Sequence, residues 1–225
     1  MQIYADFAGY SLIALGLAEL FGYKLPVNFN FPYISTSFRE FWKRWHISLS
    51  SFLMEYLYFP LGGNRKGKAR TYLNLMVVMI LGGLWHGAAW SYAVWGAFHG
   101  ILLATERLLS GDKARKHALI VQVLKGLMVF SLVTLGWLLF KLPNFQDVIQ
   151  YFKSMVQNRH LWVNEALITY ILIYSSPVVF YHIFYLLNSR HLVRVKPAEY
   201  LIYATMLFLI IFNSGSPGAF IYFQF

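Results

Sequence analysis

The chain has 225 residues, of which 58% are hydrophobic and only 12% charged, and its mean hydropathy is +0.51. A soluble domain carries about a quarter charged residues, so this composition excludes a soluble globular domain and predicts a chain that crosses a lipid bilayer several times. There is no cysteine, which excludes disulfides, thiolate metal sites and a cysteine nucleophile. The net charge of +10 comes from short basic clusters between apolar runs, a pattern typical of cytoplasmic loops rather than of a nucleic-acid-binding protein.

The first apolar segment, residues 3–23, is long enough to form a spanning helix. At 37–45 the aromatic residues recur at helical spacing and the basic residues lie on other faces, which predicts an amphipathic helix at the membrane interface. Residues 47–61 are apolar but short and end at Pro60-Leu61-Gly62-Gly63. They predict a re-entrant or partly buried segment rather than a full span.

A long apolar stretch at 72–109 predicts two helices folded as a hairpin, with Gly82, Gly83 and Gly87 permitting close packing or a break. Further spans are predicted at 118–140 and 162–187, separated by a polar stretch, with a last apolar run at 200–212. The predicted fold class is therefore an all-α, polytopic transmembrane protein with five or six spans, an interfacial amphipathic helix and a re-entrant segment.

The basic loops at 65–70, 107–117 and 190–196 give the expected orientation. All three face the cytoplasm if the chain crosses the membrane an even number of times between them. A hairpin at 72–109 meets that condition, and so does the pair of spans that follows. The amphipathic segment then lies on the cytoplasmic side as well.

His86 is the first candidate for chemistry, because ionisable residues within membrane segments are costly and often functional. It is flanked by glycine and tryptophan inside the apolar hairpin. An imidazole buried away from carboxylates stays neutral and can accept a proton near neutral pH. The alternative is a histidine that only hydrogen-bonds between helices. The residues by themselves leave both interpretations open.

Three other ionisable residues carry weaker hypotheses. His46 follows the amphipathic helix and is either a second polar group at an entry to the site or an ordinary interfacial histidine. Asp6 is expected either to pair with a basic residue or to bind a polar ligand, and His99 to pack in a helix interface. His182 and His191 have no acidic neighbour in the sequence, so no metal site is expected.

Four stretches in order resemble the membrane-bound O-acyltransferase family, and specifically its bacterial polysaccharide O-acetylation branch. They are DFAGYSLIALGLAELFG, NFNFPYISTSFREFWKRWHISLSSF, YLYFPLGGNRKG and LGGLWHGAAWSYAVWGAFHG. The C-terminal FIYFQF is also similar to the end of that branch. The resemblance is strong over 1–109 and rests on general pattern over 118–225. One departure is Met54-Glu55, where the family commonly has an Arg-Asp pair.

The resemblance implies that His86 is the catalytic histidine and that His46 is a second histidine facing the same tunnel. The family moves an acyl group from a thioester to a hydroxyl, which implies acetyl-CoA or a similar thioester as co-substrate and no bound cofactor or metal. Substrate or donor contacts are predicted for Asp6, Asn64, Arg65, Lys66 and Trp85, and donor contacts also for Arg39, Lys43 and Arg44. Contact with lipid headgroups is an equally good interpretation of each basic residue.

The implied protein is an O-acetyltransferase of the bacterial inner membrane that acts on an exported polysaccharide, with alginate the first expectation and periplasmic acetyl-transfer proteins as partners. The alternatives are peptidoglycan as acceptor, D-alanyl transfer to teichoic acid, and a catalytically inactive fragment with a structural role. A transporter is disfavoured because no repeated halves are visible. Family members are longer, so residues 1–225 are expected to be one transmembrane domain forming the C-terminal half of a longer protein.

Overall fold

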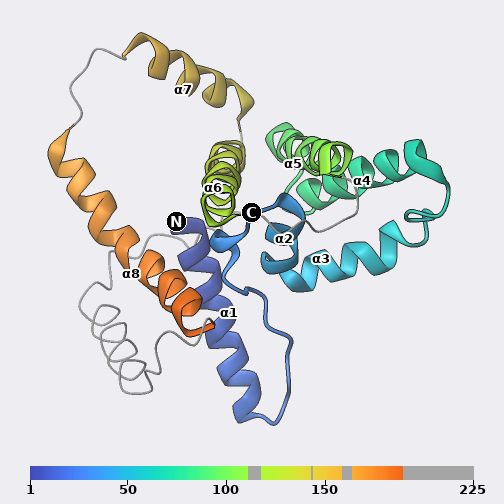
Figure 1. The fold of residues 1–225 in the computed structure, drawn as a ribbon, viewed down its shortest axis with the longest axis horizontal. Helices are drawn as coiled ribbons and strands as arrows, with labels where there is room; N and C mark the ends of the chain where they lie inside the picture. Colours follow the sequence, from blue (N-terminus) through green and yellow to red (C-terminus); the bar gives the residue numbers. More distant parts are fainter. Residues whose placement is uncertain (111–117, 143, 159–163, 190–225) are drawn as a thin grey trace. The chain divides into compact units, whose positions relative to one another are not determined.

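The computed structural model describes residues 1–110, 118–142, 144–158 and 164–189, and every regular element in these ranges is helical (Figure 1). The helices are α1 (Gln2–Leu20), α2 (Phe38–Arg44), α3 (Ile47–Leu53), α4 (Gly67–Leu84), α5 (Trp90–Ser110), α6 (Leu119–Lys141), α7 (Phe145–Gln157) and α8 (Glu165–Ser189), with a short 3-10 helix η1 (Pro32–Ile34) and a π-helical turn η2 (Met54–Tyr58). The all-α prediction is confirmed for these residues. The predicted run at 200–212, the basic residues 190–196 and residues 111–117 lie outside them.

Internal contacts divide the chain into two units. The first contains Met1–Tyr10 and Val163–Phe225, and the second contains residues 11–162. Within the first unit, the ring of Tyr4 on α1 packs edge-on against His182 on α8, with 5.3 Å between ring centroids. Helices α2 to α7 belong to the second unit, which holds both predicted catalytic histidines.

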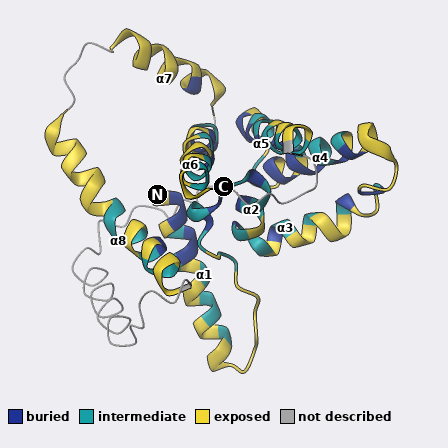
Figure 2. Cartoon of the chain, viewed as in Figure 1, coloured by how far each residue is buried: buried dark blue, intermediate teal, exposed yellow. Residues whose placement is uncertain are grey.

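Three helices in the described residues are long and apolar enough to cross a membrane: α1, α6 and α8. They correspond to the predicted spans at 3–23, 118–140 and 162–187. Their apolar side chains are largely exposed, as expected of surfaces that face lipid (Figure 2). Helices α4 and α5 are not among them, so three of the five or six predicted spans correspond to helices that are long and apolar enough to cross a membrane.

The predicted hairpin at 72–109 is confirmed as α4 and α5, which pack side by side and are joined by a turn at 85–89 (Figure 1). Glycine permits this close approach from both sides. A Cβ atom added to Gly83 would overlap the carbonyl oxygen of Tyr92, and one added to Gly96 would overlap the carbonyl oxygen of Met79. The two backbones are therefore in direct contact, as small residues allow in membrane helix pairs.

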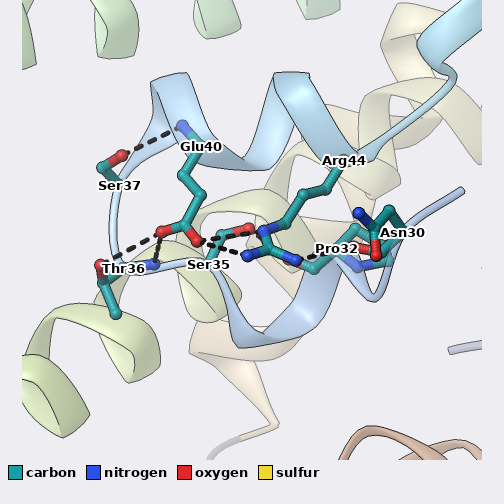
Figure 3. Close-up of polar contacts among 7 residues, drawn as sticks. All are labelled: Asn30, Pro32, Ser35, Thr36, Ser37, Glu40 and Arg44. Atoms are coloured by element: carbon teal, nitrogen blue, oxygen red, sulfur yellow. Dashed lines mark hydrogen bonds and ion pairs between the residues drawn. The ribbon is translucent and has the colours of Figure 1, made fainter. Parts of the chain in front are cut away.

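The predicted amphipathic helix is confirmed as α2, and its sequence shows why it begins at Phe38. The Ser37 hydroxyl accepts a hydrogen bond from the backbone N–H of Glu40, and the Glu40 carboxylate accepts from the backbone N–H of Thr36, at 3.0 and 2.9 Å (Figure 3). This is close to a capping box, which satisfies N–H groups that the first helical turn leaves unpaired. Glu40 also forms an ion pair with Arg44, one turn later.

The aromatic face of α2 is buried in protein. Phe41 is 1% exposed and stacks on His99 of α5, while Trp45 is 3% exposed and packs against Trp137 of α6. Arg39 and Lys43 lie outside this packed face and reach the cavity described below. The helix is thus fixed by tertiary contacts, and its location at the membrane interface stays a prediction.

Replacing Ser37 with alanine is expected to lower the stability of the protein by about 1 kcal/mol, the usual cost of losing a helix N-cap. The measurement is thermal unfolding of the detergent-purified protein. Ser37→Asp is the matched variant, because its carboxylate can accept the same N–H and is favourable at a helix N-terminus. Equal melting temperatures for Ser37→Ala and wild type would contradict the capping role.

Residues 47–58 form one helical run, α3 followed by η2, and then turn sharply at Gly62 and Gly63. Both glycines have positive φ, 106° and 52°, which an L side chain rarely adopts. The Asn74 amide on α4 donates to the carbonyl oxygens of Leu61 and Gly63, so the turn is tied to the hairpin. That this segment is re-entrant stays a prediction.

Helix α7 differs from the sequence-based expectation, which is only a polar stretch between the two spans. Its apolar residues at 145, 148, 149, 152, 155 and 156 fall on one face of a helix. The Asn144 side chain caps the helix by accepting from the backbone N–H of Gln146. Helical periodicity was therefore present in the sequence and was the signal that could have found this helix.

Candidate active site

His86 lies in the turn that follows α4, and three aromatic rings surround it. Its backbone N–H donates to the carbonyl of Gly83, which continues the last turn of the helix. The imidazole packs edge-on against Trp95 of α5 and Phe140 of α6, with centroid distances of 5.7 and 5.0 Å. The third ring is His46, at 6.1 Å. The structure thus brings the two predicted histidines together from positions forty residues apart.

His46 is the N-cap residue immediately before α3, and its backbone is left-handed, with φ 44°, a conformation that non-glycine residues rarely adopt. Its Nδ1 lies 3.1 Å from Oδ1 of Asn28. Burial, followed by the nearby His86, lowers the pKa of His46 to about 4. His46 is therefore neutral at physiological pH and can act as a hydrogen-bond acceptor or a base.

A cavity of about 830 Å³ opens beside His86, between α2, α3, η2, α4 and α5. Much of its wall is apolar, and it includes Trp42 and Trp95. Three cationic side chains, Arg39, Lys43 and Arg107, belong to the same wall. Glu55 also belongs to this wall, so one cavity joins His86 to three cationic side chains and one carboxylate, an arrangement suited to a ligand with both an anionic part and a reactive part.

Some of the other predicted contact residues lie in the cavity wall and some do not. Asn64 is in the cavity wall, where its side-chain oxygen accepts hydrogen bonds from the hydroxyl of Tyr58 and from Arg107. Arg65 and Lys66 are exposed and are not part of the wall. Their predicted contact with the donor stays a prediction.

Trp85 is 64% exposed, its ring packs 6.1 Å from Phe52, and it does not line the cavity. Arg44 is engaged elsewhere, since its guanidinium binds Glu40 and the carbonyl of Asn30 (Figure 3). Asp6 belongs to the first unit, and its role stays a prediction. Of the eight predicted contact residues, Asn64, Arg39 and Lys43 reach the cavity wall.

Sequence reasoning missed Asn28, Trp95 and Arg107 as parts of the site. Trp95 and Arg107 both lie on α5, but twelve residues are about three and a third helical turns, so the helical period does not link them. Asn28 lies in an irregular segment before η1, where no periodicity applies. His99 is fully buried between α2, α5 and α6, in the helix interface where it was predicted.

Residues 1–140 match the membrane-bound O-acyltransferase family, which is more than half of the chain and includes every residue of the site just described. The chain belongs to this family. The peptidoglycan O-acetyltransferase of Helicobacter pylori is 37% identical and matches all of this chain but 47% of its own length. The probable alginate O-acetylase AlgI of Pseudomonas aeruginosa is 48% identical over 68% of this chain and 29% of its own length. The teichoic acid D-alanyltransferase of Streptococcus thermophilus is 38% identical over 44% of this chain.

The chain spans about half the length, or less, of these curated relatives. The family assignment holds for the matched residues. The presence of three helices long and apolar enough to span a bilayer agrees with a membrane-bound family. In the part of the chain that the structure describes, no group of three or more His, Asp or Glu side chains is placed to hold a metal ion.

Proposed function

We propose that this protein is a membrane-embedded O-acyltransferase that moves an acetyl group from a cytoplasmic thioester to a hydroxyl of an exported polysaccharide. The bacterial inner membrane is its proposed location, and acetyl-CoA or a similar thioester is the co-substrate. A periplasmic acetyl-transfer protein is a proposed partner in delivering the group to the polymer. The observation that carries the proposal is the cavity that joins His86 to Arg39, Lys43 and Arg107.

The residues of this cavity support each part of the reaction. His86 takes the proton from the acceptor hydroxyl as its oxygen attacks the thioester carbonyl carbon. The tetrahedral intermediate then collapses, the carbon–sulfur bond breaks, and the thiolate leaves and recovers a proton from the imidazolium. Arg39, Lys43 and Arg107 attract the anionic part of the donor, a phosphate group of acetyl-CoA or the acidic surface of a carrier.

Alginate is the first proposed acceptor, because the probable alginate O-acetylase AlgI of Pseudomonas aeruginosa is 48% identical over 68% of this chain. Peptidoglycan is the second candidate, because similarity to the peptidoglycan O-acetyltransferase extends over the whole chain. D-alanyl transfer is a weaker alternative, since that similarity covers less than half of the chain. All three share the same chemistry at His86 and differ in the acyl group or the acceptor.

The test is complementation in hosts that lack their own enzyme. We expect the gene, with any neighbouring coding sequence that extends the chain, to restore ester-linked acetate, measured by mass spectrometry of alginate in one host and of peptidoglycan in another. D-alanine esters in place of acetate would overturn the proposed donor. Absence of any ester, with protein present in the membrane, would favour the structural role without activity.

Replacing Arg39 or Arg107 with alanine is expected to raise the KM for acetyl-CoA by about tenfold to a hundredfold and to change kcat little. Each substitution removes a charge-assisted hydrogen bond, worth about 1.5–3 kcal/mol, from donor binding. The measurement is transfer of labelled acetate in membrane vesicles over a range of acetyl-CoA concentrations. Lys68→Ala is the matched control, because Lys68 is exposed at the start of α4 and is not in the cavity wall. An unchanged KM in both arginine variants would exclude this donor contact.

A further inference from the structure

The start of α2 is tied to the end of α5 by a hydrogen bond between residues 68 positions apart. The backbone N–H of Phe38, the first residue of α2, donates to the carboxylate of Glu106. The N–H groups of a first helical turn have no acceptor within their own helix. A carboxylate is favourable here, because it makes a charge-assisted bond and faces the positive end of the helix. Glu106 therefore anchors α2 to α5.

Helix α2 depends on contacts of this kind because it is short. Its seven residues form too few internal hydrogen bonds for a helix to persist alone in water. The rings of Phe41 and Trp42 pack against His99 of α5, with centroid distances of 6.4 and 5.1 Å. These rings hold one face of α2 against α5, and the bond to Glu106 fixes its first turn. Together the two kinds of contact fix the position and the rotation of α2.

The rotation of α2 decides which of its side chains reach the cavity. Arg39 and Lys43 lie four residues apart, on one face of the helix, and both belong to the cavity wall. Arg107 of α5 belongs to the same wall. Phe38 precedes Arg39 in the chain, and Glu106 precedes Arg107. The bond between Phe38 and Glu106 thus joins the backbone neighbours of two cavity arginines.

Arg107 is also held from a second side. Its guanidinium donates to the side-chain oxygen of Asn64 at 3.4 Å, and the same oxygen accepts from the hydroxyl of Tyr58. Neighbouring residues on a helix point in directions about 100° apart, so Glu106 and Arg107 can bind different partners. Glu106 connects α5 to α2, and Arg107 connects it to the turn after η2.

We propose that Glu106 is a positioning residue: its bond to the N–H of Phe38 sets the spacing between Arg39 and Arg107, so that both cations act on one anionic group of the donor. The inference rests on the proposed function, which places the anionic part of the thioester donor at these arginines. Two guanidinium groups bind one anion better than either alone when they are held at the right separation beforehand. Glu106 is not part of the cavity wall and acts through the helix.

A purely electrostatic role for Glu106 would have the opposite effect on donor binding. If Glu106 only weakened the positive potential of the cavity, removing its charge would strengthen the binding of an anionic donor. If it holds α2 by a hydrogen bond, removing the acceptor weakens donor binding. Glutamine removes the charge and keeps an oxygen that accepts an N–H. Comparing Glu106→Ala with Glu106→Gln therefore separates the two roles.

Glu106→Ala is expected to raise the KM for acetyl-CoA about threefold to tenfold and to change kcat little, because both arginines remain but are no longer held together. Glu106→Gln is expected to keep the KM within about twofold of wild type. The measurement is transfer of labelled acetate in membrane vesicles. Glu19→Ala is the matched control, because Glu19 is an exposed carboxylate on α1 that is not in the cavity wall.

A KM that is unchanged in Glu106→Ala, or that shifts equally in both Glu106 variants, would overturn the positioning role. Glu106→Gln keeps the test decisive if Glu106→Ala fails to accumulate in the membrane. A KM below the wild-type value in Glu106→Gln would then show that Glu106 acts by its charge alone.

A second test measures the spacing itself and does not depend on activity. The chain has no cysteine, so the substitutions Arg39→Cys and Arg107→Cys give two specific sites for nitroxide labels. The distance between the labels is measured by electron paramagnetic resonance in lipid vesicles. We expect one narrow distribution with Glu106 or Glu106→Gln and a broader one with Glu106→Ala.

Equal label distances in all three proteins would overturn the proposal, whether or not the protein transfers acetate. If the distances change as expected but the wild-type protein transfers no acetate, the proposed function fails and the role of Glu106 in spacing the arginines stands.

Discussion

His86→Gln is expected to abolish acetyl transfer while the protein accumulates in the membrane at the wild-type level. Glutamine is similar in size and polar, so the contacts with Trp95 and Phe140 lose little. Its amide cannot take up a proton at neutral pH, and loss of a general base costs about a hundredfold to ten-thousandfold in rate. The measurement is the ester-linked acetate content of the polysaccharide in cells that depend on this gene.

The control for this variant is Lys68→Ala, which alters a charge outside the cavity and is expected to retain acetylation. Membrane abundance is compared by immunoblot of an epitope-tagged protein. Wild-type acetate content in His86→Gln cells would remove His86 from the mechanism. A loss of protein, rather than of activity, would show that the histidine holds the turn after α4 instead.

Gly96→Ala is expected to destabilise the protein by about 3 kcal/mol or more and to reduce its level in the membrane severely. An added Cβ would lie 2.8 Å from the Cα of Ile80 and would overlap the carbonyl oxygen of Met79. Both are backbone atoms of α4 that cannot rotate away, so the hairpin must separate or distort. Overpacking costs about 1–3 kcal/mol where side chains can adjust, and a backbone contact cannot adjust in that way.

Two other glycines provide a graded comparison by thermal unfolding in detergent. Gly100→Ala meets the sulfur of Met76 at 2.7 Å, the flexible end of a side chain, and should cost little. Gly16→Ala on α1 meets nothing within 4 Å and should be neutral or stabilising, since alanine favours helix over glycine by about 1 kcal/mol. Equal stability of all three variants would contradict the close backbone contact between α4 and α5.

Much of the site was predictable because its two histidines lie in sequence motifs. The stretches around His46 and His86 resemble the family closely enough to pair the two residues, and the structure places their rings 6.1 Å apart. Trp85, from the same motif, was predicted to contact substrate and lies outside the cavity. A motif shows which residues accompany a function. The direction in which the Trp85 and His86 side chains point depends on the backbone of the turn at 85–89.

The sequence by itself determined the membrane-protein family, the all-α character of the described residues, where the helical hairpin lies and which histidines deserve testing. Those properties follow from composition, helical period and local motifs, all of which are read along the chain. Only the tertiary structure brought Asn28 to His46, through contacts between the segment before η1 and the start of α3, and Arg107 to the cavity of Arg39, through the packing of α2 on α5. Patterns along the chain thus predict the helices, whereas contacts between segments distant in sequence bring together the residues around His86.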